Sequence, residues 1–278
     1  MSGTADFNKE VGYGSIRNYF PYTKFGKAPA GVQATITDIW DRADATPTQQ
    51  VWVAPTQARV HALVSSSTAD NGVTPSTGAR TVRVYGLTSW TDMKSPNGQP
   101  LHEDYEDVIL NGQTPVNTTK SWVIIHRMRV RTAGTGGVNA GTITATAATD
   151  GTVTAAILAG NGSTLMAIFG VPEGWQHYIY SIHPAVSKAS GAAATVNFTV
   201  WDYDYTDPTL PVANIRDELA VQSTGSSIVH DEYDFGLRFT GPCIIRVRGV
   251  ANTADVEGIV TWDGVTRKQT RAVQWQGE

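Results

Sequence analysis

The stretch GARTVRVYG at residues 78–86 is written a second time, in looser form, as GAAATVNFTV at residues 191–200. Both stretches begin with a glycine and alternate β-branched or aromatic residues with polar ones, which is typical of a half-buried strand after a turn. Similar short runs continue from residue 34 onward, separated by turn dipeptides such as NG at 71, 97 and 111 and DG at 150. This pattern predicts an all-β fold of the sandwich or barrel type.

An internal duplication is indicated by four landmarks that recur in the same order at a nearly constant offset. The pairs are Pro55 and Pro172, Thr81-Val82 and Thr195-Val196, Arg127-Met128-Arg129 and Arg246-Val247-Arg248, and Gly141 and Gly258. A repeated supersecondary unit is the simplest source of such self-similarity. We therefore expect two tandem β-sandwich modules, jelly-roll or immunoglobulin-like, over residues 33–151 and 152–278.

Residues 1–32 show no steady hydrophobic period but are rich in aromatic side chains, and we expect them to form an extended N-terminal arm. Exposed aromatic rings waste apolar area worth about 25 cal/mol per Å², so the arm should pack on another surface, for example a neighbouring subunit. The candidate interface aromatics are Tyr19, Phe20, Tyr22 and Phe25.

The composition of the chain argues against several classes of function. The formal net charge is -4 with a pI near 5.9, so the chain offers no global attraction to nucleic acid. The single cysteine, Cys243, rules out an internal disulfide framework. No stretch is apolar enough to be a signal peptide core or a membrane span, and we expect a product made and kept in a cytoplasm unless other machinery exports it.

The clearest local pattern is HRMRVR at residues 126–131. Because side chains alternate along a strand, Arg127, Arg129 and Arg131 should share one face while His126 and Met128 share the other. Arg246 and Arg248 repeat the stripe in the second half. These five arginines are candidate subunit-interface residues; the alternative is that they pair with carboxylates on neighbouring strands, such as those in HEDYED (102–107) or DEYD (231–234).

Other chemistry has weaker support. Asp202, Asp204 and Asp207 could offer calcium ligands but lack the remaining features of a known loop. Acid pairs for glycoside cleavage could be drawn from residues 103–107, as from any acidic loop. Nucleophile, zinc-protease and phosphate-binding motifs are missing from the sequence, so we expect no enzyme activity and no metal or cofactor.

Several segments together resemble a family of virion structural proteins of tailed bacteriophages, notably marine ones. They are GARTVRVYGL (78–87), EDVILNGQTPVNTTKSWVIIHRMRVRTAG (106–134), GTITAT (141–146) and LAGNGSTLMAIFGVPEGW (158–175). The resemblance covers roughly residues 35–180, and this chain differs by inserting TSWTDMKSPNGQPLHED (88–104). It implies a role in the particle and no catalytic residues.

The leading hypothesis is therefore a non-enzymatic bacteriophage structural protein in the virion, assembled in the host cytoplasm. It would form a homo-oligomer, such as a trimer, and decorate or cement the head beside proteins such as the major capsid protein. One alternative is a tail, neck or fibre-attachment component. Another is an adhesion module that binds host glycan through exposed tryptophans; the candidates are Trp90, Trp122, Trp175 and Trp201.

Overall fold

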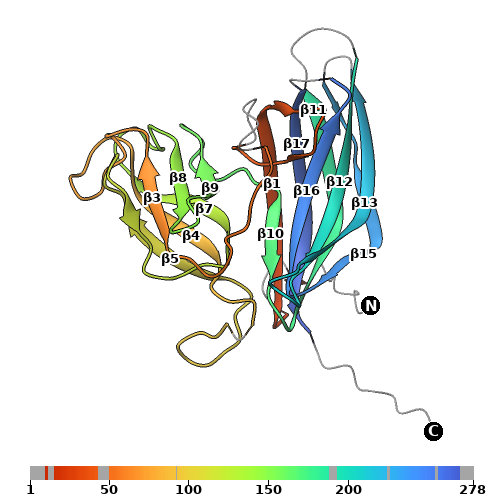
Figure 1. The fold of residues 1–278 in the computed structure, drawn as a ribbon, viewed down its shortest axis with the longest axis horizontal. Helices are drawn as coiled ribbons and strands as arrows, with labels where there is room; N and C mark the ends of the chain where they lie inside the picture. Colours follow the sequence, from red (N-terminus) through yellow and green to blue (C-terminus); the bar gives the residue numbers. More distant parts are fainter. Residues whose placement is uncertain are drawn as a thin grey trace, which may run out of the picture.

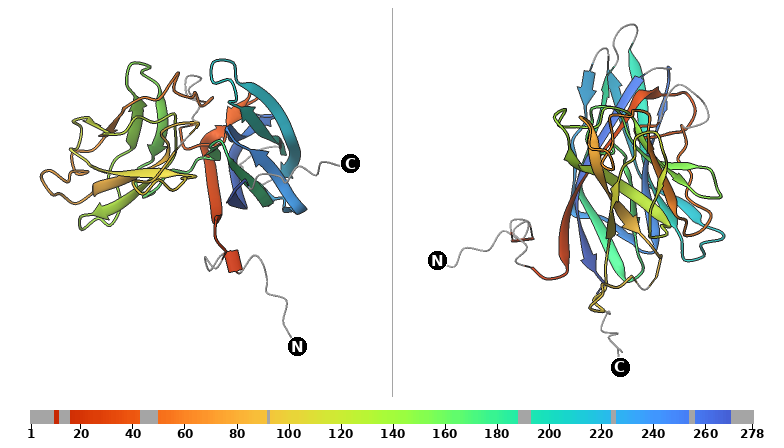
Figure 2. Two further views of the ribbon diagram at one scale, coloured as in Figure 1. Left: turned by 90° about the horizontal axis from the view of Figure 1, so that it is seen from below. Right: turned by 90° about the vertical axis from the view of Figure 1, so that its left-hand side faces the viewer.

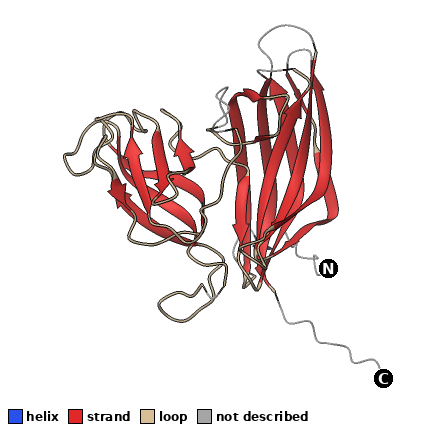
Figure 3. Cartoon of the chain, viewed as in Figure 1, coloured by secondary structure: helices blue, strands red, loops and turns tan. Residues whose placement is uncertain are grey.

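The computed structural model describes residues 10–11, 16–42, 50–91, 93–187, 193–223, 226–253 and 256–269. Residues 10–11 are helical. Every other element assigned in this part of the chain is a β-strand, and the paired strands are antiparallel. The strands form two groups that lie side by side (Figures 1 and 3). The all-β sandwich class predicted from the alternating patterns is confirmed.

The first sandwich is formed by two sheets, with strand orders β6-β3-β8-β9 and β5-β4-β7. Its strands are β3 (His61–Ser65), β4 (Ala79–Leu87), β5 (Asp104–Ile109), β6 (Val116–Asn117), β7 (Ile124–Ala133), β8 (Ile143–Ala147) and β9 (Val153–Ile157). β3 and β8 alternate buried and half-buried residues along their whole length, as strands do when one face lies on a core.

The second sandwich has larger sheets. One has the order β1-β17-β11-β14 with β15 also paired to β11, and the other has the order β10-β16-β12-β13 with β2 also paired to β16. Its strands are β1 (Tyr19–Val32), β2 (Thr37–Asp38), β10 (Ile168–Val171), β11 (Trp175–Ser187), β12 (Ala194–Asp204), β13 (Val212–Ser223), β14 (Ser226–Ile228), β15 (Asp231–Thr240), β16 (Cys243–Ala251) and β17 (Val256–Lys268).

The two sandwiches share one order of strands. The sheet β5-β4-β7 corresponds to β13-β12-β16, and β6-β3-β8-β9 corresponds to β14-β11-β17-β1. Two of the four sequence landmarks fall on matching strands, namely β4 and β12, and β7 and β16. Gly141 lies just before β8 and Gly258 near the start of β17, and the two prolines precede β3 and β11. The shared strand order explains why the landmarks recur in the same order along the chain.

The two sandwiches are not arranged in tandem with the expected boundaries. β1 lies within the segment expected to be an arm, yet it pairs with β17 from Tyr19↔Arg267 to Val32↔Val256, and β2 pairs with β16. The second sandwich is thus built from both ends of the chain. β9 pairs with β8, so the chain leaves the first sandwich after residue 157 instead of near residue 151.

One continuous hydrophobic core runs through both sandwiches, with the rings of Trp40, Trp52, Trp122 and Trp262 fully buried in it. β1 and β10 lie on the side of the second sandwich that faces the first (Figures 1 and 2). Backbone bonds fix the connecting segment, because Ala167 N–H donates to Ile39 O at 2.8 Å and Lys27 N–H donates to Leu165 O at 3.2 Å. The two sandwiches therefore meet across a packed junction.

Candidate functional site

A cluster of polar side chains lies buried at the junction. The imidazole Nε2 of His126 on β7 lies 2.6 Å from Glu103 Oε2, and the Tyr22 hydroxyl on β1 donates to the same carboxylate oxygen at 3.2 Å. Lys24 on β1 donates through Nζ to the backbone carbonyl of His126. Burying polar groups is costly unless they are hydrogen-bonded. Here His126 and Glu103 pair within the first sandwich, while Tyr22 and Lys24 reach them across the junction from β1.

Electrostatics at the junction follow from this burial. Burial lowers the pKa of His126 to about 4 and also lowers the pKa of Lys24. Burial alone would raise the pKa of Glu103, but the hydrogen bond from His126 and nearby positive charges hold it below its usual value. Gly170 N–H donates to His126 Nδ1 at 3.4 Å, so Nε2 of the neutral ring carries the proton and donates to Glu103.

Residues 88–104, expected from the sequence to be an insertion, contact the second sandwich in several places. Trp90 stacks on Tyr205 with ring centroids 4.5 Å apart, and His102 stacks on Phe20 at 4.0 Å. Glu103 belongs to the same segment. Residues 88–104 therefore help to join the two sandwiches.

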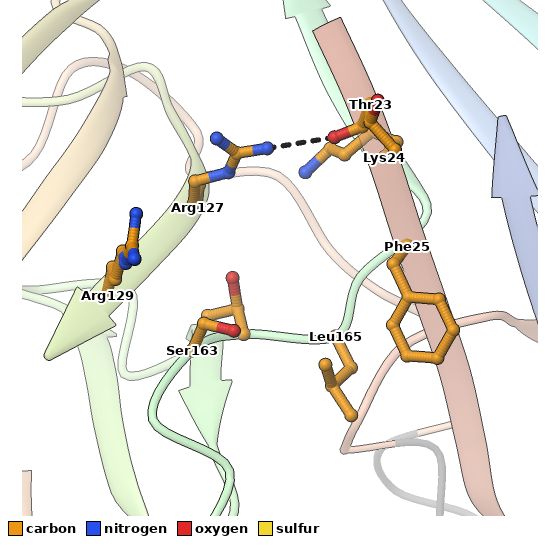
Figure 4. Close-up of a pocket in the computed structure, with 8 residues that line it drawn as sticks. Thr23, Lys24, Phe25, Arg127, Arg129, Ser163 and Leu165 are labelled. Carbon is orange, nitrogen blue, oxygen red and sulfur yellow. Dashed lines mark hydrogen bonds between the residues drawn. The ribbon is translucent and has the colours of Figure 1, made fainter. Parts of the chain in front are cut away.

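A groove opens to solvent beside this cluster, between β7 and β1. It has a volume of about 340 Å³ and is lined by Thr23, Lys24, Phe25, Arg127, Arg129, Ser163, Thr164 and Leu165. We call it the junction groove. Figure 4 shows the Arg127 guanidinium reaching across it to the carbonyl of Thr23, to which it donates at 2.9 Å. A second hollow of about 310 Å³ continues from Arg129 past Arg131.

The basic stripe on β7 has the predicted alternation, since His126 and Met128 are buried while Arg129 and Arg131 are exposed and Arg127 is half-buried. The Arg127 guanidinium lies 4.5 Å from the centre of the Tyr22 ring. The side chains of Arg129 and Arg131 make no hydrogen bond or ion pair with another described residue. The charge of Arg127 acts on the buried Glu103 and that of Arg131 acts on Asp107. Arg129 therefore lines one wall of the junction groove without a carboxylate partner among the described residues.

Arg246 and Arg248 on β16 occupy a different environment. Both donate to Asp38, Arg246 through Nε at 3.0 Å and Arg248 through Nε at 3.2 Å, and Asp38 is fully buried. The side chain of Arg246 is itself buried, so it has no free face to offer a neighbouring subunit. Pairing with a carboxylate was the alternative considered from the sequence, but the partner is Asp38 and not the DEYD or HEDYED segment.

The four N-terminal aromatics lie on β1 and contact the chain itself. Tyr22 is buried at the junction, Phe20 stacks on His102, and Tyr19 accepts a hydrogen bond at 3.3 Å from Arg267. Phe25 is half-exposed and lines the junction groove. Of the four, Phe25 is therefore the aromatic best placed to contact another molecule through the groove.

The outer edge of the second sandwich exposes several large apolar side chains. They are Leu210, Val212, Ile215, Ile228 and Phe235, with Phe235 92% exposed. They lie on or next to β13, β14 and β15, at the edge remote from the first sandwich (Figure 1). We call this set of residues the apolar edge.

The remaining candidates separate clearly. Trp122 and Trp175 are buried and offer no sugar platform, which corrects that expectation for both, whereas Trp90 and Trp201 are half-buried. Asp202 pairs with Arg216 at 3.3 Å. In the described ranges, no three His, Cys, Asp or Glu side chains gather in a way that could hold a metal ion. No helix within those ranges is long and apolar enough to cross a membrane.

Comparisons with known proteins add little. No protein-family model matches the chain, and no curated protein matches it. A structure of infectious bursal disease virus, Gx strain, matches over 92% of this chain and 73% of that chain, with 7% identity and a TM-score of 0.22. A VP2 subviral particle of the same virus matches over 95% of this chain and 77% of that chain, with 8% identity and a TM-score of 0.19. Scores of this size carry no argument about fold or function.

The junction cluster was not found by sequence reasoning. His126 was placed on the inner face of its strand, but Tyr22, Lys24 and Glu103 come from segments read as an arm and an outer loop. A usable signal was the alternation of Tyr22, Lys24, Gly26 and Ala28, which all point inward on β1. The alternation is hard to recognise in the sequence, because two of these four inward positions hold a lysine and a glycine instead of apolar side chains.

Proposed function

We propose that this chain is a non-enzymatic structural protein of a bacteriophage virion, assembled as a homo-oligomer on the head surface as a decoration or cement protein. The sequence resemblance to tailed-phage virion proteins supports a structural role in the virion. Proteins such as the major capsid protein would be its neighbours, and assembly would take place in the host cytoplasm.

The observation that carries an assembly role is the apolar edge. Large apolar residues exposed together on neighbouring strands mark surfaces that bind other proteins. β13 also ends its sheet, so its outer backbone groups are free to pair with another chain in the way edge strands do. A particle that repeats one contact by symmetry would cover such a surface in every copy.

Mass spectrometry of purified virions tests this proposal. The chain should be found in the particle and remain bound through repeated purification. Its copy number separates positions, because a head decoration requires hundreds of copies whereas a neck or tail ring requires about a dozen or fewer. Absence of the chain from virions would contradict the proposal, and so would depolymerisation of host surface polymers by the purified protein.

A second candidate, glycan binding, is favoured by one hollow. It has a volume of about 640 Å³ and is lined by Trp90, Tyr205, Glu173 and neighbouring residues, which combines aromatic rings with a carboxylate as sugar sites often do. Glycan-array binding that is abolished by Trp90→Ala and retained in Trp201→Ala would support this candidate. A flat array would count against it.

A further inference from the structure

A protruding bulge interrupts β15 at the apolar edge. β15 pairs with β11 through Leu237↔Ile179 and then through Glu232↔Ser181, so the residues 233–236 lie opposite the single residue Tyr180. Such extra residues leave the ladder and re-aim their side chains. Phe235, 92% exposed, stands on this bulge.

The bulge is held in a defined shape. The Tyr233 hydroxyl donates to Asp217 on β13, which ties the bulge to the opposite sheet. Gly236 has a φ of 72°, a left-handed conformation that glycine adopts without strain. A Cβ at this glycine would lie 3.1 Å from the Tyr180 ring. The Phe235 side chain is therefore held in an exposed position by a bulge of defined conformation.

Two acidic side chains precede Phe235 on the bulge. Glu232 and Asp234 are exposed, and the only partner of the Glu232 carboxylate among the described residues is the exposed His230 at 2.8 Å. Asp234 has no hydrogen bond or ion pair with another described residue. The bulge thus presents one exposed aromatic ring with two exposed carboxylates just before it in the chain.

The junction groove has the complementary character. Arg129 supplies an exposed, unneutralised guanidinium on one wall, with Arg131 next to it along the strand. Phe25 and Leu165 supply apolar surface on the other side (Figure 4). Positive charge beside a short apolar wall matches an exposed aromatic ring that follows two exposed carboxylates, both in sign and in polarity.

We propose that the β15 bulge of one copy docks into the junction groove of a second copy of this chain. Phe235 would lie on Phe25 and Leu165, while Glu232 and Asp234 would face Arg129 and Arg131. Because the bulge and the groove are different surfaces, the contact is head-to-tail and generates a ring if the rotation between copies closes. This inference rests on the proposed homo-oligomeric function and names its contact.

Charge reversal on each side tests the contact. Arg129→Glu with Arg131→Glu makes the groove negative, and Glu232→Lys with Asp234→Lys makes the bulge positive. Each double variant should raise the dissociation constant of the oligomer by about 100-fold, measured by sedimentation velocity over a range of concentrations. A chain that carries all four substitutions should assemble again. A mixture of the two double variants should associate again through contacts between unlike copies, and it should close rings only with an even number of copies.

Restored assembly cannot be explained by misfolding of either double variant. Phe235→Ser should weaken assembly as well, whereas Val73→Ser, which changes an apolar residue 64% exposed on the first sandwich, should not. Lys268→Glu serves as the charge control, because Lys268 is exposed at the end of β17.

Three results would overturn the contact: a wild-type chain that stays monomeric at all concentrations, wild-type assembly in both double variants, or no recovery in the four-substitution chain. The last two results are distinguishable from failure of the proposed function, whereas a strictly monomeric wild type would contradict both. A chain present in virions whose oligomer ignores the substitutions would refute the contact alone. A chain that self-associates as proposed but is absent from virions would refute the particle role alone.

Discussion

Arg246 Nε donates to Asp38 Oδ1 at 3.0 Å, and both side chains are buried. The two residues are separated by 208 positions and belong to neighbouring strands, β16 and β2. The same carboxylate accepts the backbone N–H of Trp52 at 2.7 Å. One buried carboxylate therefore connects three parts of the chain: β16, β2 and the segment around Trp52 that leads into the first sandwich.

Asp38→Ala should destabilise the protein by about 3–5 kcal/mol, because it leaves a buried guanidinium without its counter-charge. Chemical denaturation would measure the loss. The matched control is Asp107→Ala, which removes an ion pair with Arg83 of 2.7 Å at the surface and should cost about 1 kcal/mol or less. Equal losses in the two variants would show that burial of the Asp38 pair is unimportant.

Asp70 organises the loops of the first sandwich in the same manner but without a cation. Its buried carboxylate accepts the hydroxyl of Ser65 at 2.6 Å and the backbone N–H groups of Ala79 at 2.7 Å, Ala140 at 2.7 Å and Gly141 at 2.8 Å. Asp70→Ala would orphan these donors, and each unsatisfied buried donor costs about 1–3 kcal/mol.

We therefore expect Asp70→Ala to lower the free energy of unfolding by several kcal/mol, with hydrogen exchange rising first in β4 and in the loop before β8. Ser66→Ala is the control, because its hydroxyl accepts the single N–H of Thr142 at 3.0 Å at the surface. Exchange that rises equally throughout the second sandwich would contradict this local role.

The sequence alone predicted the strands whose inner faces are apolar. β7 is the best example, because its buried His126 and Met128 alternate with exposed Arg129 and Arg131 as expected. β1 could not be recognised in this way, since its inner face carries Lys24 and Gly26 while Phe25 points outward. The reason lies in the junction: Lys24 is needed to reach the carbonyl of His126, and Gly26 is needed for close approach.

The candidate sites show the same limit. Arginines on β7 were placed correctly on an exposed face, because strand alternation is a local property. The partner of Arg246 was not found, because pairing between β2 and β16 depends on strand order, which no local pattern contains. The β15 bulge was also missed, since DEYDFG reads as an ordinary acidic strand until its register with β11 is known.

Gly26 tests whether β1 is an integral strand of the second sandwich. A Cβ at this position would lie 2.5 Å from both the Cβ and the backbone nitrogen of Ala167, so Gly26→Ala forces the backbone of β1 away from the junction. We expect a loss of about 1–3 kcal/mol, as in other overpacked sites. Thermal unfolding of the isolated chain would show it.

Lys27→Ala is the neighbouring control, because Lys27 pairs with the half-exposed Glu257 at 3.1 Å and should cost about 1 kcal/mol or less. An arm that clasped only a neighbouring subunit would give a different result. In that case Gly26→Ala would leave unfolding of the dilute monomer unchanged and would affect only assembly.

The pH dependence of stability should report the buried His126. Its pKa falls from 6.5 to about 4 on folding, so between these values the unfolded chain binds a proton that the folded chain does not. The contribution of this group is complete above pH 6.5 and is lost as the pH falls toward 4, by about 3 kcal/mol in total. Glu103, Lys24 and Arg127 are the charged groups that act on the ring.

Other groups titrate over the same range, so His126 must be isolated by comparison. Burial raises the pKa of Asp41 to about 7, which has the opposite effect: its contribution is lost as the pH rises from 3.8 toward 7. His126→Gln removes the proton that the unfolded chain takes up at this residue. The decline in unfolding free energy between pH 6.5 and 4 should therefore become shallower, by the slope that corresponds to about one proton. If urea denaturation at each pH gave the same slope for wild type and His126→Gln, the ring would not be held neutral at the junction.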